Sequence, residues 1–196
     1  MAFQDSREWR LGDNAQRDWA KIMGESGRIA IPVYGAESNA LVTKAPMLFF
    51  MGGMLVAPDV LVMTPAKNFW HEVKAKAVPT WRRCHPGPRW EHGIDFALIE
   101  EYETVQAESG ADVFIIVWEE HSPTGNPRSG EDFRQYLRGD PEWLAISIAA
   151  AIKHGEHRKD WPKRNGNPSD LGRNGQGGLL WSRSAMKQID MNSLRQ

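Results

Sequence analysis

Apolar residues recur along this chain with two different periods, one typical of helices and one typical of strands. Residues 14–23 place Ala15, Trp19, Ile22 and Met23 at helical spacing, so we predict a first helix there. Short β-prone runs follow and predict consecutive strands joined by turns. They are Arg28–Tyr34, Ala45–Phe50, Pro58–Met63 and Asn68–Lys76.

A second helix and a buried strand are predicted after a connection rich in Pro, Gly, Trp and Arg at Pro79–Gly93. Residues Ile94–Ser109 carry apolar side chains on one helical stripe, and Gly110 ends the segment. Ala111–Glu120 then contains a continuous apolar run, which is typical of a strand covered on both faces. The predicted order up to this point is α-β-β-β-α-β, so we expect an α/β protein.

The remainder of the chain shows a weaker pattern. Asp140-Pro141 favours the start of a helix that runs from Glu142 to about Lys153, and Gly178–Met186 is expected to add a terminal strand or loop. We therefore expect one domain overall, with a core over residues 1–120 and a C-terminal extension of helix and loop over residues 121–196 packed on it.

Composition argues against several classes of protein. The 196 residues include one cysteine, Cys84, so neither an intramolecular disulfide nor a cysteine-based zinc site can form within the chain. Six histidines are scattered without a full set of ligand spacings, and we expect no zinc. The longest apolar stretch, Pro46–Val62, is interrupted by glycine and proline and is too short to span a membrane. Residues 1–8 lack the pattern of a secretory signal, so a cytoplasmic protein without a membrane partner is expected.

Charge is balanced overall but unevenly distributed. There are 24 Lys and Arg against 25 Asp and Glu, which argues against a protein that coats nucleic acid through bulk charge. Ile94–Glu120 contains eight acids and no Lys or Arg, whereas Lys67–Arg89 and Lys153–Gln196 are basic. Two basic segments therefore flank an acidic one.

The most informative pattern is Pro58-Asp59 followed, after twelve residues, by Glu72-Val73-Lys74. Side chains alternate along a strand, so Glu72 and Lys74 share one face while Val73 points into the core and can offer its carbonyl. Two carboxylates and a carbonyl are hard oxygen ligands suited to Mg²⁺ or Mn²⁺. A lysine beside them can position a water molecule and stabilise negative charge on a phosphate.

Each part of this pattern also has a purely structural explanation. Pro-Asp is common in turns, so Asp59 alone is compatible with a turn residue. Glu72 with Lys74 is also compatible with an ion pair on a solvated face. From the residues alone, both explanations stay open beside the metal site.

This Pro-Asp…Glu-x-Lys pattern, within the α-β-β-β-α-β order, resembles the motif of the PD-(D/E)XK nuclease superfamily, which includes restriction endonucleases and Holliday junction resolvases. Three further segments, His92–Asp95, Tyr102–Gln106 and Gly110–Trp118, are similar to those of phage- and plasmid-type members. The resemblance covers roughly Gly12–Glu120. It implies a restriction-endonuclease-like core with a mixed central sheet flanked by helices.

The resemblance also implies a function. It predicts a Mg²⁺- or Mn²⁺-dependent endonuclease that hydrolyses DNA phosphodiester bonds and is encoded by a phage or another mobile element. Asp59, Glu72 and the Val73 carbonyl would hold the metal, and Lys74 would orient the attacking water.

Residues on both helices would support this site. Tyr102 and Gln106, one helical turn apart, would face the metal, with Gln106 a supporting polar residue of the catalytic set. Many members of the superfamily carry a glutamate on the first helix as an additional acid. Here that position holds Gln16, with Asp18 two residues on, so we expect either weaker metal binding or a single tightly bound metal.

Basic residues interleaved with tryptophan are the candidates for contact with DNA. They are Lys76, Arg82, Arg83 and Arg89. Packed tryptophans beside solvated arginines would give the same pattern. DNA is the expected partner, and a homodimer is possible.

Two other functions compete with the nuclease. One is a DNA-binding or assembly protein that keeps the nuclease fold without cleavage. The other is a small interaction protein that uses the acidic helix and the tryptophan-rich loop as a protein interface. The acidic stretch Glu100–Glu108 should repel DNA, so it must point away from a duplex or face a partner.

Overall fold

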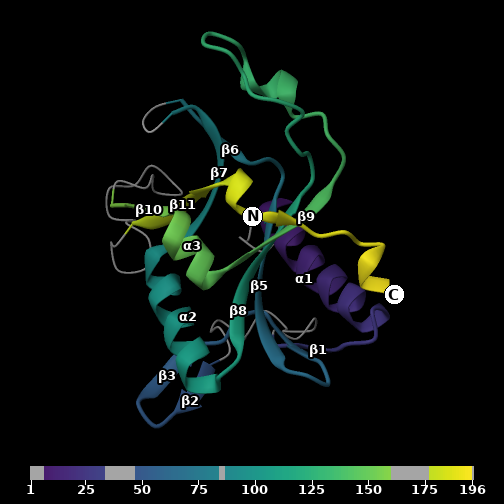
Figure 1. The fold of residues 1–196 in the computed structure, drawn as a ribbon, viewed down its shortest axis with the longest axis vertical. Helices are drawn as coiled ribbons and strands as arrows, with labels where there is room; N and C mark the ends of the chain where they lie inside the picture. The colour runs from purple at the N-terminus through teal and green to yellow at the C-terminus, as the bar shows by residue number, and fades with distance from the viewer. Residues whose placement is uncertain (1–6, 34–46, 84–86, 160–176, 196) are drawn as a thin grey trace.

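A six-stranded mixed sheet lies at the centre of the molecule, with the strand order β1-β4-β5-β8-β9-β12 (Figure 1). Its strands are β1 (Ile29–Pro32), β4 (Val60–Met63), β5 (Asn68–Lys76), β8 (Asp112–Glu119), β9 (Glu142–Ser147) and β12 (Lys187–Gln188). The computed structural model describes residues 7–33, 47–83, 87–159 and 177–195. Tyr34, Ala45, Pro46 and Cys84, named above, lie outside these ranges, as does the stretch 160–176 of the second basic segment.

The expected α-β-β-β-α-β order is present within this central sheet. Helix α1 (Arg7–Glu25) precedes β1, β4 and β5, and β4 pairs antiparallel with both of its neighbours. Helix α2 (Phe96–Ser109) then provides the crossover that lets β8 pair parallel with β5. The predicted fold class, an α/β core with a mixed central sheet flanked by helices, is therefore confirmed, and it is the arrangement that the resemblance implies.

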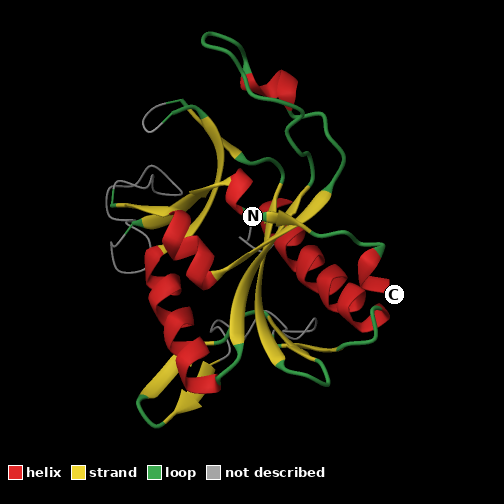
Figure 2. Ribbon diagram, viewed as in Figure 1, coloured by secondary structure: helices red, strands yellow, loops and turns green. Residues whose placement is uncertain are grey.

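Helices cover both faces of this sheet (Figure 2). On one face, Trp19 and Met23 of α1 share a core with Val73 of β5. On the other face lie α2 and α3 (Ile148–His154), and Tyr102 of α2 shares a second core with Trp70. Since neighbouring residues of a strand face opposite sides, the even-numbered residues of β5 face α2. Across the four described ranges, no helix has both the length and the apolar character needed to cross a bilayer.

Two pieces are inserted into this core. The hairpin of β2 (Met47–Phe50) and β3 (Gly53–Val56) lies between β1 and β4 in the chain. A second sheet has the strand order β10-β11-β7-β6. Its strands are β6 (Thr80–Arg82), β7 (Arg89–Asp95), β10 (Gly155–Arg158) and β11 (Gly178–Ser182).

The prediction of an irregular connection over Pro79–Gly93 is wrong, because β6 and most of β7 lie within it. Strand β7 pairs with β6 on one side and, on the other, with β11 near the other end of the chain. Trp90 is buried in β7, although its neighbours in sequence are polar or charged. A strand with such a distant partner leaves little local periodicity to detect.

The predicted helix over Glu142–Lys153 is wrong in its first half. Residues 142–147 form β9, which pairs antiparallel with β8 and buries Trp143, Leu144 and Ile146. The apolar positions of this segment are compatible with the periodicity of a helix and with that of a strand. The open edge of β8 favours the strand, because it offers backbone hydrogen bonds. The helix begins only at Ile148, where the Ser147 hydroxyl accepts a hydrogen bond from the Ala150 N–H. The terminal strand expected within Gly178–Met186 is confirmed as β11.

Candidate active site

Asp59 and Glu72 come together because β4 and β5 form an antiparallel pair. Val60 pairs with His71, and the same register one residue further places Asp59 opposite Glu72. Both residues are almost completely buried, at 4% and 3% exposure. Two neighbouring buried carboxylates cost free energy unless a proton or a cation compensates their charge.

Asp59 is held by a backbone amide and by the first helix. Its Oδ2 atom accepts a hydrogen bond of 2.7 Å from the Val73 N–H, and the Gln16 side chain forms a further hydrogen bond to it. Burial raises the pKa of Asp59 to about 8, and the like charge of Glu72 adds to the shift. The positive charge of Lys74 acts in the opposite direction.

The Val73 carbonyl lies on the same side of β5 as Asp59. The N–H and C=O groups of one strand residue point the same way, and the Val73 N–H points at Asp59. Pro58 is the next residue opposite Val73 in this register, and proline has no N–H to donate to that carbonyl. The proline of the motif therefore interrupts the ladder at the backbone position that the sequence predicts as a metal ligand.

Glu72 is held through both of its carboxylate oxygens. The Tyr102 hydroxyl donates a hydrogen bond of 2.5 Å to Oε2, and the Lys74 ammonium group donates to Oε1. The Lys74 side chain is 35% exposed, whereas that of Glu72 is 4% exposed. Of Glu72, Lys74 and Tyr102, Lys74 is therefore the side chain that reaches solvent.

The supporting residues predicted on the helices divide into two groups. Gln16 and Tyr102 contact the carboxylates, as described above. Asp18 lies on an exposed face of α1, because a step of two residues turns a helix by about 200°. The Gln106 Oε1 atom accepts a hydrogen bond of 3.1 Å from the Val113 N–H, and the side chain lines a groove of about 210 Å³ between α2 and α3. A role for Gln106 in the chemistry stays a prediction.

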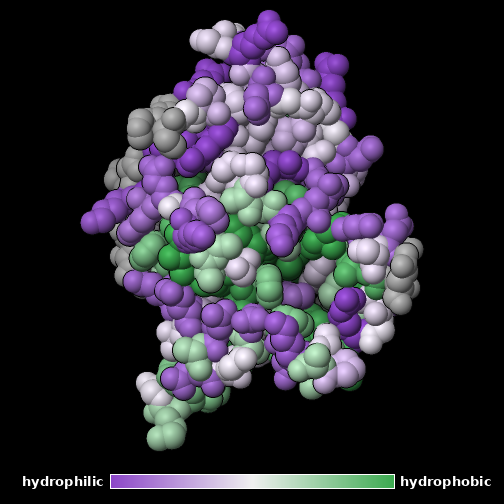
Figure 3. Space-filling view, in the orientation of Figure 1, coloured by the Kyte–Doolittle hydropathy of each residue, from purple (hydrophilic) through white to green (hydrophobic). Residues whose placement is uncertain are grey.

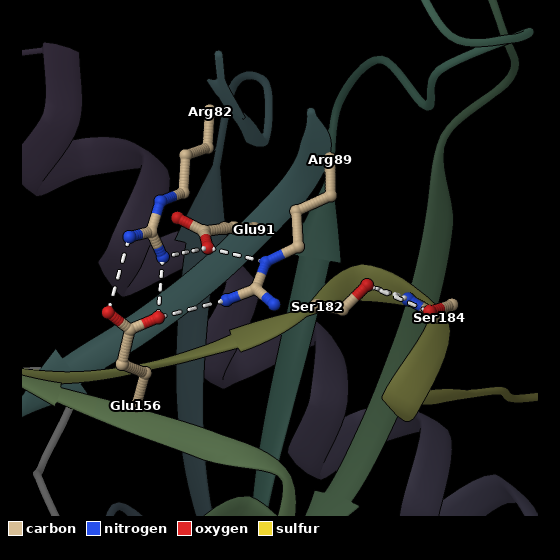
Figure 4. A network of polar contacts seen from close by, with 6 residues as sticks. All are labelled: Arg82, Arg89, Glu91, Glu156, Ser182 and Ser184. Carbon is tan, nitrogen blue, oxygen red and sulfur yellow. Dashed lines mark hydrogen bonds and ion pairs between the residues drawn. The ribbon is translucent and has the colours of Figure 1, made fainter. Parts of the chain in front are cut away.

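Two of the four predicted DNA contacts are engaged by acids (Figure 4). Arg82 donates hydrogen bonds to Glu91 at 3.1 Å and to Glu156 at 2.7 and 3.2 Å, and its side chain is only 8% exposed. Arg89 donates to Glu91 at 2.7 Å. Hydrogen bonds from Arg82 lower the pKa of Glu156. These arginines therefore join β6, β7 and β10 to one another, whereas the adjacent Arg83 is exposed.

A second buried charge cluster, which the sequence pattern did not indicate, lies at the C-terminal end of β8. Glu119 is fully buried, contacts His92 at 2.5 Å and accepts two hydrogen bonds from Arg183, at 3.0 and 3.1 Å. Burial lowers the pKa of His92, against the opposing effect of Glu119. The register pairs Lys76 with Glu119, so this cluster lies on the same face as Lys74. In the sequence, the signal for this cluster was an acidic residue, Glu119, at the end of an apolar strand. The sequence around Arg183 carried no such signal.

The donor set fits a magnesium-like ion. Mg²⁺ is commonly bound through one or two carboxylates and completed by water and substrate phosphates, and the site offers Asp59, Glu72 and a backbone carbonyl. Burial, together with the like charge of Glu72, raises the pKa of Asp59, and a divalent cation bound to the pair would favour its ionised form. Within the described ranges, no group of three or more His, Cys, Asp or Glu side chains is placed to hold a metal. A metal bound by Asp59 and Glu72 would therefore complete its coordination with the backbone carbonyl, water and substrate phosphate rather than with a third acidic side chain.

Comparisons with known proteins give likenesses of structure alone. No family model matches the chain, and no curated protein matches it. The chain is similar in structure to Hjc, a Holliday junction resolvase from Archaeoglobus fulgidus, at 13% identity and a TM-score of 0.48, with 91% of each chain covered. A likeness of this size does not assign an activity.

Proposed function

We propose that this chain is a divalent-metal-dependent nuclease that hydrolyses phosphodiester bonds in DNA. The observation that carries the proposal is the buried pair Asp59 and Glu72, joined through Glu72 to the Lys74 ammonium group. The sequence resemblance supports DNA as the substrate and a phage or other mobile element as the origin. The single cysteine supports a location in the cytoplasm.

The residues of the cluster have separate tasks. Asp59, Glu72 and the Val73 carbonyl would hold the metal, which when bound supplies Lewis-acid stabilisation of charge on the phosphate. Lys74 is oriented by Glu72 and partly exposed, so it is placed to position a water molecule and to offset charge on the scissile phosphate. Gln16 and the Val73 N–H hold Asp59, and Tyr102 holds Glu72.

A matched pair of lysine variants tests the proposal. Linear, supercoiled, single-stranded and four-way-junction DNAs are incubated with the protein and Mg²⁺ or Mn²⁺. Lys74→Gln is expected to lower the cleavage rate by about 100-fold or more, because it removes charge where the transition state develops it. Lys67→Gln is the control, since Lys67 also pairs with an acid, Asp112 at 3.0 Å, but is 58% exposed and precedes β5.

Two outcomes would overturn the nuclease proposal. One is the absence of cleavage by folded wild-type protein on every substrate with either metal. The other is equal cleavage by Lys74→Gln and wild type. Asp59→Asn provides an independent check, because it keeps the shape of the side chain while removing the charge that a metal ligand needs.

One observation favours a second candidate, a protein that binds DNA through this fold without cutting it. The residue that hydrogen-bonds Asp59 from α1 is Gln16, an amide, where the resemblance predicts an additional acid. Gln16→Glu is expected to tighten Mg²⁺ binding, measured by calorimetry, because a third carboxylate joins the site. Asn14→Asp adds the same charge at an exposed position of α1 and should leave the affinity unchanged. Cleavage that appears only with Gln16→Glu would favour the non-cutting candidate.

A further inference from the structure

The hairpin of β2 and β3 has one apolar face packed on the protein and one apolar face exposed. Leu48 and Leu55, which pair across the two strands, pack against the core on the α2 side. On the outer face Phe49 pairs with Met54, and these residues are 79% and 60% exposed. In Figure 3, hydrophobic side chains project at the lower end of the molecule, where Figure 1 places β2 and β3.

This hairpin presents its outer side chains from a regular backbone. All four residues of β2 pair with residues of β3 in one antiparallel register. Its turn depends on glycine, because Gly53 has a φ of +140°. Charged residues or proline commonly protect an exposed strand edge, yet Met47–Val56 contains only apolar residues and glycine. An apolar face without such protection marks an interaction surface.

Negative charge borders this apolar face. Helix α2, against which β3 packs, carries four glutamates and no Lys or Arg. Figure 1 places the hairpin beside the C-terminal end of α2, where Glu108 is exposed. The backbone dipole of a helix is also negative at its C-terminal end, and the last turn of α2 contains no basic residue to offset it.

This charge decides which occupant suits the apolar face. DNA, an anionic membrane surface and a second copy of this chain would each bring further negative charge against α2. A partner that carries basic residues around an apolar centre would instead be attracted to it. Charge complementarity therefore favours a basic protein partner.

We propose that the outer face of the hairpin, together with the C-terminal end of α2, binds a basic amphipathic helix of another protein. A strand of four residues is about 13 Å long, which matches about two turns of a helix. Apolar side chains three and four residues apart on the bound helix would contact Phe49 and Met54. Its Lys or Arg residues would face Glu108.

The area of the exposed face fits a transient complex. Met47, Phe49, Met51 and Met54 are 37%, 79%, 106% and 60% exposed. This exposure amounts to roughly 600 Å², at about 200 Å² for a large apolar residue. Interfaces that bury less than about 1,200 Å² over both partners are typical of weak, transient complexes. We therefore expect a dissociation constant in the micromolar range.

A partner bound at the hairpin would lie close to the candidate active site. Strand β3 ends at Val56, and Ala57 and Pro58 connect it to Asp59. Both connecting residues are buried, so the base of the hairpin is attached firmly to the carboxylate cluster. The proposal does not rest on the nuclease activity, because this binding needs neither metal nor DNA.

Two synthetic peptides of about 20 residues test the charge of the partner. Both carry the same stripe of Leu and Phe at helical spacing, and the flanking positions hold Lys in one peptide and Glu in the other. In calorimetric titration the Lys peptide is expected to bind, and the Glu peptide should bind at least about 10-fold more weakly, because α2 attracts one and repels the other. High salt should weaken binding of the Lys peptide.

Four variants locate the contact. Phe49→Ser should lower the affinity for the Lys peptide by about 10-fold or more, because it removes a large aromatic side chain from the contact. Ile152→Ser is the matched control, since Ile152 is 40% exposed but lines the groove on the α3 side of α2. Glu108→Lys should lower the affinity for the Lys peptide and raise that for the Glu peptide. Glu25→Lys makes the same change of charge at the end of α1 and should alter neither affinity.

The proposal is overturned if the Lys peptide does not bind at concentrations up to about 1 mM, or if both peptides bind equally well. It is also overturned if Phe49→Ser binds like wild type, or if Ile152→Ser loses as much affinity as Phe49→Ser, which would place the contact in the groove between α2 and α3. Equal effects of Glu108→Lys and Glu25→Lys would likewise contradict a local contact with α2.

Two further measurements separate this proposal from its alternatives. A dimer in sedimentation velocity that Phe49→Ser dissociates would assign the face to a second copy and overturn the basic partner. Far-UV circular dichroism of the hairpin variant should match wild type, because Phe49 lies outside the core. A protein that binds the Lys peptide but cuts no DNA would refute only the nuclease, and one that cuts DNA but binds neither peptide would refute only the basic partner.

Discussion

The Tyr102 hydroxyl on α2 donates a hydrogen bond of 2.5 Å to the Oε2 atom of Glu72 on β5. This bond joins the crossover helix to the strand that carries the Glu-x-Lys part of the motif. With Lys74 at the other oxygen, the Glu72 carboxylate is oriented from two elements at once. Tyr102 is therefore a positioning residue for the proposed metal ligand.

Tyr102→Phe keeps the ring in the core and removes only the hydroxyl. We expect the free energy of unfolding to fall by about 1–3 kcal/mol, because a buried carboxylate oxygen loses its donor. Metal-dependent cleavage should fall by about 10- to 100-fold, since partners that orient a ligand affect metal binding and rate by this amount. Urea unfolding and DNA cleavage measure the two effects. Tyr136→Phe is the control, because Tyr136 also donates to an acid, Glu131, but in a separate loop; cleavage by Tyr102→Phe at the wild-type rate would contradict the assignment.

The raised pKa of Asp59 predicts an unusual pH dependence of stability without metal. In the folded protein this carboxyl keeps its proton up to about pH 8, whereas in the unfolded chain it loses the proton near its ordinary pKa of 3.8. The folded state therefore binds the extra proton between these values, and the free energy of unfolding should fall as pH rises from about 4 to 8.

Asp59→Asn isolates this contribution. The variant should lose less stability than wild type between pH 5 and pH 8 in metal-free denaturant unfolding. Mg²⁺ should restore wild-type stability most strongly near pH 8, because the metal competes with the proton for the same oxygens. Parallel pH profiles of the two metal-free proteins would show that Asp59 titrates normally.

Glu119→Gln tests the second buried cluster. The substitution removes a fully buried charge that His92 and Arg183 both contact, while Arg183 keeps its second acidic partner, Glu142, and is 22% exposed. We therefore expect a loss of about 1–3 kcal/mol, the cost of weakening buried hydrogen bonds to a charged group. Glu120→Gln is the neighbouring control: its partner Arg7 is 73% exposed, so the loss should stay below about 1 kcal/mol. Similar unfolding midpoints for both variants would argue that the Glu119 network contributes little.

Arg82, buried in β6, and the exposed Arg83 that follows it should differ in their effect on DNA binding. Arg83→Gln is expected to reduce the salt dependence of DNA affinity by about one unit of slope, because an exposed arginine that meets a phosphate releases a counterion. Arg82→Gln should instead lower the unfolding midpoint, since Arg82 joins Glu91 to Glu156. Filter binding over a salt series together with thermal unfolding measures both. A larger change of slope for Arg82→Gln would reverse this assignment.

Sequence reasoning succeeds here where the determining interactions are local. The strand prediction Asn68–Lys76 matches β5 residue for residue, because its β-prone side chains are recognised from neighbouring positions. The motif spacing places Asp59 opposite Glu72, directly before the strand that pairs with β5, since an antiparallel pair joined by a short turn has a register that the turn decides. The α-β-β-β-α-β order follows from the same local patterns.

Tertiary structure decided whatever depends on partners far apart in the chain. Strand β7 is held on one side by the distant β11, and β9 forms because β8 offers it an open edge, so neither shows the expected periodicity. Arg82 has the sequence pattern of a DNA contact and the surroundings of a structural ion pair, because Glu156 is 74 residues away. The composition of the chain determines which side chains are available for chemistry. Only the packing of distant elements determines which of these side chains become buried and contact one another. Burial changes the charge of Asp59, and the contacts decide the partners of the arginines.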